Sequence, residues 1–128
     1  MNKNKKILII DDEKLIVKAF EDHLKREGYD IEVAYDGEEG LTKAKEFKPD
    51  LILLDILMPK VDGITLLRDL KNSSETESIP VVMITNLESK ENIDETNKLG
   101  SLVYLIKSNH DLSAVSKKIK EIFNKINQ

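Results

Sequence analysis

The sequence predicts an α/β fold, in which one parallel five-stranded sheet carries helices on both faces. Short, continuously apolar runs recur along the chain, as expected of strands that are buried on both sides. Segments with apolar residues at helical spacing lie between these runs, and such alternation is typical of right-handed crossovers in a parallel sheet. The chain has 128 residues, of which 40% are hydrophobic. These values favour a single domain spanning residues 1–128.

The first half of the chain is expected to supply three strands and two helices. Strands are predicted at residues 7–10, at 31–34 and at 51–54, and the second of these is the weakest. The first helix is predicted to stop at Gly28. It is indicated by apolar residues at helical spacing, namely Leu15, Ile16, Ala19, Phe20 and Leu24. A turn at Asp36-Gly37 precedes the second helix, which shows Leu41, Ala44 and Phe47 on one face.

The second half is expected to supply two strands and three helices. Residues 80–84 and 102–106 are predicted strands, and the polar segment 72–78 is a linker-like loop that is too short to separate domains. The helix at 88–99 has only Ile93 and Leu99 as clear apolar residues before Gly100, so we expect it to be the least stable helix. Apolar residues at helical spacing indicate the other two helices: Ile64, Leu66, Leu67 and Leu70, then Leu112, Val115, Ile119, Ile122, Phe123 and Ile126.

Polar residues follow four of the predicted strands directly. These residues are Asp11-Asp12 after the first strand, Asp55 after the third, Thr85 after the fourth and Lys107 after the fifth. Because the carboxyl ends of parallel strands meet at one edge of a sheet, the side chains should converge there. Three carboxylates so close together repel one another, and a divalent cation removes that repulsion. Oxygen ligands without His or Cys favour Mg²⁺, Mn²⁺ or Ca²⁺.

The ammonium of Lys107 and the hydroxyl of Thr85 suit an incoming anion better than the metal. A metal ion, an ammonium group and a hydroxyl around a carboxylate fit phosphoryl transfer, in which the protein positions groups and neutralises charge. A carboxylate can itself be the nucleophile and become an aspartyl phosphate. Asp55 is the best placed for this role, because it lies between the acids and Lys107 on the expected edge.

The chain resembles the receiver domain of two-component response regulators, of the single-domain CheY-like kind, over essentially its whole length. The residues that carry the resemblance are Asp11-Asp12, Asp55, Met58-Pro59, Asp62-Gly63, Thr85, Tyr104 and Lys107. The resemblance implies a flavodoxin-like sheet with strand order 2-1-3-4-5. It further implies a signalling switch that catalyses only its own phosphorylation and dephosphorylation.

The resemblance also implies a role for each of these residues. Asp55 would accept a phosphoryl group from a histidine kinase or phosphotransfer protein. Asp12, Asp55 and the backbone carbonyl of Leu57 would bind Mg²⁺, or alternatively Mn²⁺, while Asp11 would orient a metal-bound water. Lys107 and Thr85 would contact the phosphoryl oxygens. Tyr104 would swing inward as Thr85 moves, so that a downstream protein reads a changed surface on the last two helices and the fifth strand.

Three departures from the family pattern lie at the expected site. Ser108 follows the lysine where the family usually has proline. A cis bond is costly without proline, so the sequence leaves the geometry of the Lys107–Ser108 bond open. Asn86 follows Thr85 where a small residue is usual, and Leu57 and Leu87 are apolar residues that flank the site. These residues suggest a shielded phosphoryl group that hydrolyses slowly.

Two other functions are considered beside the switch. One is a docking module that does not depend on phosphate and keeps the pocket as a relic. The other is a phosphatase with an aspartate nucleophile, which generally resembles an Asp-x-Asp strand end. Here Ile56 and Leu57 follow Asp55, so the second acid is missing. Turnover of a phosphomonoester would favour the phosphatase, and failure to bind Mg²⁺ or accept phosphate would favour the docking module.

Composition narrows the partners and the compartment. The formal net charge of −4 argues against direct binding of nucleic acid, which needs a basic face. The chain contains no cysteine, which excludes disulfides and thiolate metal sites and fits a reducing compartment. No apolar run is long enough to span a membrane. We therefore expect a cytoplasmic protein with no output domain in this sequence.

Overall fold

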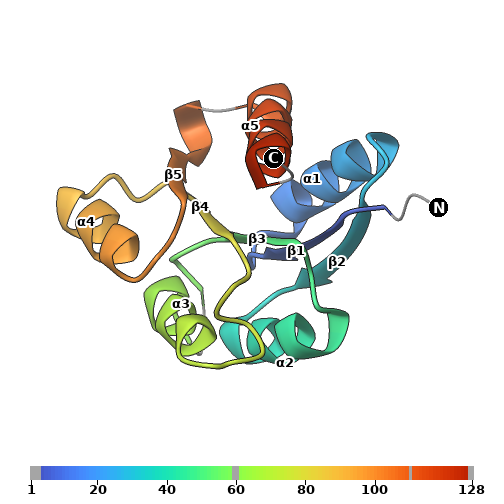
Figure 1. The fold of residues 1–128 in the computed structure, drawn as a ribbon. Coiled ribbons are helices and arrows are strands. Elements are labelled where there is room, and N and C mark those ends of the chain that lie inside the picture. Colours follow the sequence, from blue (N-terminus) through green and yellow to red (C-terminus); the bar gives the residue numbers. More distant parts are fainter. Residues whose placement is uncertain (1–3, 59–60, 110, 127–128) are drawn as a thin grey trace.

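The computed structural model describes residues 4–58, 61–109 and 111–126, and the polypeptide there folds as a parallel sheet between two layers of helices (Figure 1). The strand order is β2-β1-β3-β4-β5, which confirms the predicted fold. The strands are β1 (Lys6–Ile10), β2 (Asp30–Ala34), β3 (Leu51–Leu54), β4 (Val81–Thr85) and β5 (Val103–Ile106). The helices are α1 (Lys14–Arg26), α2 (Gly37–Phe47), α3 (Gly63–Lys71), α4 (Lys90–Lys98) and α5 (Leu112–Ile126).

Apolar side chains form a separate layer on each face of the sheet. Ile7 and Ile9 of β1 pack with residues of α1 and α5, whereas Leu8 and Ile10 pack with residues of α2 and α3. Successive side chains of a strand point to opposite faces, so both faces of β1 are buried. This explains why residues 7–10 of β1 are apolar without interruption.

Short side chains cap the first turn of four described helices. A backbone N–H in that turn donates a hydrogen bond to Asp36 in α2, to Asp62 in α3, to Ser89 in α4 and to Asp111 in α5. Such N-caps satisfy donors that have no partner within the helix. Gly100, directly after the C-cap of α4, has a φ of 102°, a conformation that glycine adopts without strain. The cap expected at Gly100 is therefore present.

The predicted buried face of α1 is wrong at two positions. The side chain of Leu15 is 89% exposed and Ala19 is exposed as well, while Val17, Phe20 and Leu24 face the core. Leu15 lies in the first turn of α1, at the carboxyl edge of the sheet, where no apolar layer covers it. The core stripe therefore starts later in the helix than the hydrophobic spacing suggests.

The segment 72–78 is more ordered than a linker. Thr76 is fully buried, and its hydroxyl donates a 2.6 Å hydrogen bond to the carbonyl of Leu70 near the end of α3. The backbone N–H groups of Thr76 and Glu77 both bond to the carbonyl of Ser73. The segment is thus a closed turn that joins α3 to β4.

Helix α4 begins at Lys90, two residues later than predicted, because Ser89 is its N-cap.

Candidate functional site

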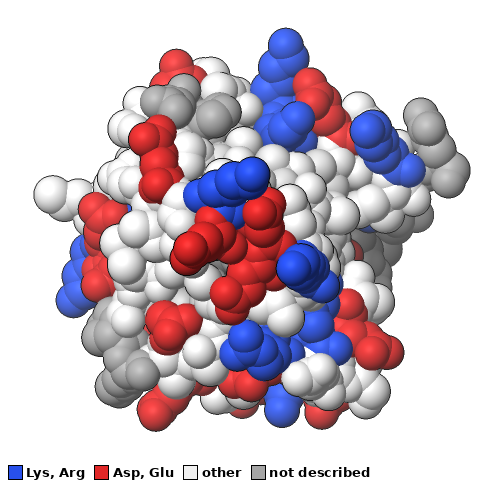
Figure 2. Space-filling view, turned by 90° about the vertical axis from the view of Figure 1, so that its left-hand side faces the viewer, with Lys and Arg blue, Asp and Glu red and all other residues white. Residues whose placement is uncertain are grey.

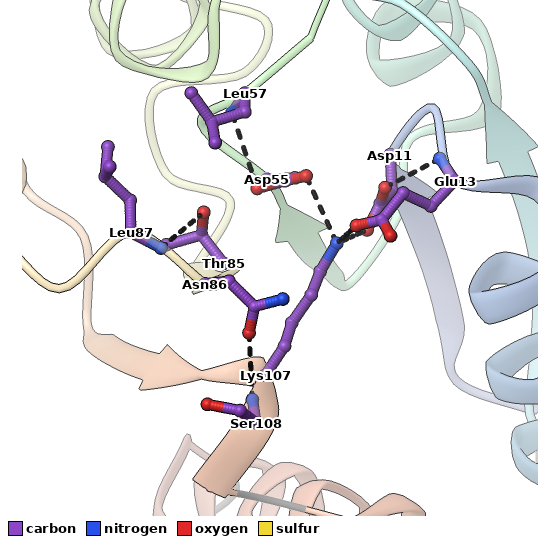
Figure 3. Close-up of polar contacts among 9 residues, drawn as sticks. All are labelled: Asp11, Glu13, Asp55, Leu57, Thr85, Asn86, Leu87, Lys107 and Ser108. Carbon is purple, nitrogen blue, oxygen red and sulfur yellow. Dashed lines mark hydrogen bonds and ion pairs between the residues drawn. The ribbon is translucent and has the colours of Figure 1, made fainter.

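Asp55 lies at the carboxyl end of the buried strand β3. Its backbone N–H continues the sheet by donating a 3.0 Å hydrogen bond to the carbonyl of Ile10 in β1. Its side chain is buried, and one carboxylate oxygen accepts a 3.4 Å hydrogen bond from the N–H of Leu57 (Figure 3). The pairing with β1 therefore fixes the backbone of Asp55, and the N–H of Leu57 helps to orient its carboxylate.

Three carboxylates meet at this edge of the sheet, as the sequence predicts. One oxygen each of Asp11, Asp12 and Asp55 can be chosen so that all three lie within 4.8 Å of one another. Asp11 and Asp55 are buried, whereas Asp12 is exposed to solvent. Burial raises the pKa of Asp11, although its hydrogen bonds with Lys107 and with the N–H of Glu13 oppose that rise. An all-oxygen cluster with two buried members and one exposed member fits a divalent cation such as Mg²⁺.

Lys107 reaches into this cluster from the opposite side. It begins a short 3₁₀ turn, η1 (Lys107–Asn109), directly after β5. Its ammonium lies 2.6 Å from Asp11, 2.6 Å from Glu13 and 3.1 Å from Asp55 (Figure 3). Burial alone would lower the pKa of Lys107. Its hydrogen bonds to Asp11 and Glu13, together with the charges of Asp11 and Asp55, raise the pKa above the ordinary lysine value.

Glu13 is a site residue that the sequence prediction missed. It precedes α1 by one residue, and its own side chain makes no capping hydrogen bond. Its carboxylate bonds to Lys107 instead, across 94 residues of sequence. The available signal was its place as the third acid of the run after β1. The direction of the Glu13 side chain, however, depends on the path of the loop.

Thr85 and Tyr104 are the two candidate switch residues. The fully buried Thr85 has a hydroxyl that accepts a 3.4 Å hydrogen bond from the N–H of Leu87. The half-buried Tyr104 donates its phenolic hydrogen bond to the carbonyl of Leu87. Burial raises the pKa of Tyr104, and the negative charge of Asp55 adds to this effect. Both candidate switch residues therefore bond to the same residue of the loop after β4.

The two unusual residues of the site bond to each other. The side-chain oxygen of Asn86 accepts a 2.9 Å hydrogen bond from the backbone N–H of Ser108 (Figure 3). A proline at position 108 has no N–H and could not donate this bond. Within the described ranges no peptide bond is cis, so the Lys107–Ser108 bond is trans, which the sequence had left open. The hydrogen bond links the loop after β4 to the short turn η1 that follows β5.

Asp62 and Gly63 complete the loop that follows Asp55. Asp62 is the N-cap of α3, and the N–H of Gly63 donates a 2.8 Å hydrogen bond to the carbonyl of Ile56. Gly63 packs so closely against the backbone of Asp55 and Ile56 that no side chain fits there. These turn residues thus hold the site in place. Pro59, which belongs to the predicted motif, lies outside the described residues.

The site and the fold define a class of protein, a doubly wound parallel α/β domain with an acidic site at the carboxyl edge of its strands. The family model of the response regulator receiver domain matches residues 7–120. The chain belongs to this family.

A curated relative supports the same family. The PhoP alkaline phosphatase synthesis transcriptional regulatory protein of Bacillus subtilis is 48% identical over 82 residues, which make up 64% of this chain and 33% of PhoP. The chain therefore matches only a minor part of that relative.

Solved structures agree over nearly the full chain. A two-component response regulator from Clostridium difficile superposes with a TM-score of 0.91 at 32% identity, covering 98% of this chain and 100% of that one. CheY of Borrelia burgdorferi, in a complex with CheX, BeF₃ and Mg²⁺, has a TM-score of 0.85 at 30% identity, with coverages of 93% and 89%. In the described part of this chain, no helix is both long and apolar enough to cross a membrane.

Proposed function

We propose that this receiver domain is a phosphorylation switch in which Asp55 accepts a phosphoryl group from a histidine kinase or phosphotransfer protein. The observation that carries the proposal is the contact of the Lys107 ammonium with Asp55, beside a cluster of three carboxylates. A nucleophilic carboxylate, a fixed cation and an acidic pocket are the parts that phosphoryl transfer to aspartate needs. Family membership supports the same assignment.

Asp12, Asp55 and the backbone carbonyl of Leu57 would hold Mg²⁺ or Mn²⁺, and Asp11 would act through a metal-bound water. The cluster geometry fits such an ion, because carboxylates with at least one exposed member leave room for water ligands. When bound, the cation would offset the charge of the carboxylates and of the phosphoryl oxygens. An unchanged Mg²⁺ affinity after Asp12→Asn would contradict this assignment.

The chain's own residues would perform the transfer. A carboxylate oxygen of Asp55 forms the new O–P bond as the P–N bond of the donor phosphohistidine breaks, and the imidazole leaves. The Lys107 ammonium donates a hydrogen bond to a phosphoryl oxygen, for which its raised pKa keeps it protonated at neutral pH. Thr85 supplies a hydroxyl donor from the neighbouring strand. Burial of Asp55 strengthens each of these charge-assisted contacts.

The output would be a shift between two arrangements of the loop after β4. Thr85 moving towards the phosphate breaks its bond with Leu87, and Tyr104 then moves inward, which changes the surface of α4, β5 and α5. Inverting a 1:99 equilibrium requires about 5.5 kcal/mol, whereas one charge-assisted hydrogen bond supplies about 1.5 to 3 kcal/mol. Several contacts, or a partner that binds the active form, must therefore act together.

The proposed partners are proteins rather than nucleic acid. On the face drawn in Figure 2, acidic and basic side chains are interspersed, with a group of acidic side chains near the middle. Together with the net charge of −4, this pattern does not favour the phosphate backbone of DNA. The downstream partner would read α4, β5 and α5.

Replacing Asp55 tests the proposal directly. Asp55→Asn should abolish labelling by a phosphodonor, because an amide oxygen is not a competent nucleophile here. The matched control is Asp69→Asn, an exposed aspartate of α3, which should be labelled like the wild type. Labelling that persists in Asp55→Asn, measured by intact mass, would contradict the assignment.

A further inference from the structure

Glu13 holds Lys107 in the structure although it is not one of the strand-end acids. The side chain of Glu13 is 48% exposed, yet its carboxylate lies 2.6 Å from an ammonium whose side chain is only 6% exposed. Among the three acids around Lys107, Glu13 alone is open to solvent, since Asp11 and Asp55 are both buried.

All three hydrogen-bond donors of the Lys107 ammonium have a carboxylate acceptor. A lysine ammonium has three N–H donors, and the acceptors are Asp11 and Glu13 at 2.6 Å and Asp55 at 3.1 Å. The ammonium therefore lies nearer to Asp11 and Glu13 than to Asp55. Its charge is shared with two acids that would not carry the phosphoryl group.

We propose that Glu13 competes with the phosphoryl group for Lys107, and that it releases Lys107 when Asp55 is phosphorylated. This inference rests on the proposed function. A phosphoryl group on Asp55 needs the ammonium as a close partner, and it brings about two negative charges. A carboxylate that shares the same ammonium repels that group and lowers the positive charge available to it. Glu13 thus stabilises the unphosphorylated arrangement of Lys107 and weakens the interaction of Lys107 with the phosphoryl group.

The difference in burial determines which carboxylate releases the Lys107 ammonium. If Lys107 left Asp11, a buried carboxylate would lose its cation, which is costly. The half-exposed Glu13 can return to water with little loss, because exposed ion pairs contribute little to stability. Glu13 is therefore the acid that can dissociate when the phosphoryl group forms.

Two substitutions of Glu13 separate the contact from the charge. Glu13→Gln removes the charge and weakens the contact. Glu13→Asp keeps the charge but is one methylene shorter, and aspartate is a favoured N-cap that would bond to the first turn of α1 instead. The matched control is Glu121→Gln, a 53% exposed glutamate that is paired with Lys118 at 3.7 Å in α5.

The measurement is the affinity for beryllofluoride at saturating Mg²⁺, by isothermal titration calorimetry. Both Glu13 variants should bind about threefold to tenfold more tightly than the wild type, whereas Glu121→Gln should match it. A second readout uses metal-free protein without beryllofluoride. There the ¹⁵N shift of the Lys107 ammonium should move in both Glu13 variants and stay unchanged in the control.

The outcomes distinguish this inference from the function on which it rests. If the wild type binds no beryllofluoride, the proposed function is overturned, and this inference, which rests on it, is overturned as well. If the wild type binds and both Glu13 variants bind with the same affinity as the wild type, only the inference is overturned. Tighter binding by Glu13→Gln with wild-type binding by Glu13→Asp would also overturn it, because the general field of the charge, and not the contact, would then be responsible.

Discussion

At the scale of single residues, Gly63 controls where Asp55 lies. A Cβ on Gly63 would overlap the carbonyl oxygen of Asp55 and would lie 2.7 Å from the Cα of Ile56. Because both neighbours are backbone atoms, the loop itself would have to move to make room. The carboxylate of Asp55 would move with it, which would disturb its 3.1 Å contact with Lys107.

Gly63→Ala is therefore expected to lower both stability and phosphorylation. The free energy of unfolding should fall by about 1 to 3 kcal/mol, as for other overpacked sites, and labelling of Asp55 should slow. Gly28→Ala is the control, since Gly28 has a φ of 98° but a Cβ added there would meet no other atom within 4 Å. It should cost stability by backbone strain and leave labelling unchanged. Equal labelling of both variants would contradict the role of Gly63.

Asn86 is expected to set the lifetime of the phosphoryl group. Its hydrogen bond to Ser108 links the loop after β4 to the turn after β5. Asn86→Ala removes this bond and opens access for water, so label should be lost several-fold faster in a time course of dephosphorylation. The control is Asn92→Ala in α4, which should keep the wild-type rate. Loss of label from Asn86→Ala at the wild-type rate would show that Asn86 has no such role.

The sequence predicted the strand-end residues of the site but not their neighbours. Asp11, Asp12, Asp55 and Lys107 follow from the rule that parallel strands end at one edge, which needs no side-chain detail. Glu13 depends on the direction of a side chain at the start of α1. The Asn86–Ser108 bond depends on the paths of two loops, and hydrophobic periodicity does not predict the path of a loop.

At the scale of elements, α4 differs from the other helices. Thr96 is its single buried residue in the described part of the chain, whereas α5 buries five residues. The sequence predicted this from the scarcity of apolar positions between 88 and 99. The start of the helix was misplaced, because a serine N-cap and a helical serine look alike in a polar segment. Few buried contacts imply a low free energy of local opening.

Amide hydrogen exchange should show that α4 opens more readily than α5. Ser89→Ala removes the side-chain acceptor for the N–H of Asn92. This should cost about 1 kcal/mol and speed exchange in α4 about fivefold. Amides of α5 in the same sample serve as the internal control and should not change. Equal protection of α4 and α5 in the wild type would contradict the expectation.

At the scale of the whole molecule, the parallel sheet brings distant segments together at one edge. Asp11 and Lys107 are 96 positions apart, yet their charged groups lie 2.6 Å from each other. The alternation of apolar runs and amphipathic segments was enough to predict this, because topology alone aligns the ends of the strands. The exposure of Leu15 was not predicted, since hydrophobic spacing does not show where a helix extends past the sheet.

The measurement that tests the central claim most directly is the intact mass after incubation with a small phosphodonor, with and without Mg²⁺. A cation-dependent phosphoryl acceptor should gain the mass of one phosphoryl group when Mg²⁺ is present, little without it, and none as Asp55→Asn. An unchanged mass of the wild-type protein in the presence of Mg²⁺ would contradict the claim that the acids at this edge exist to form an aspartyl phosphate.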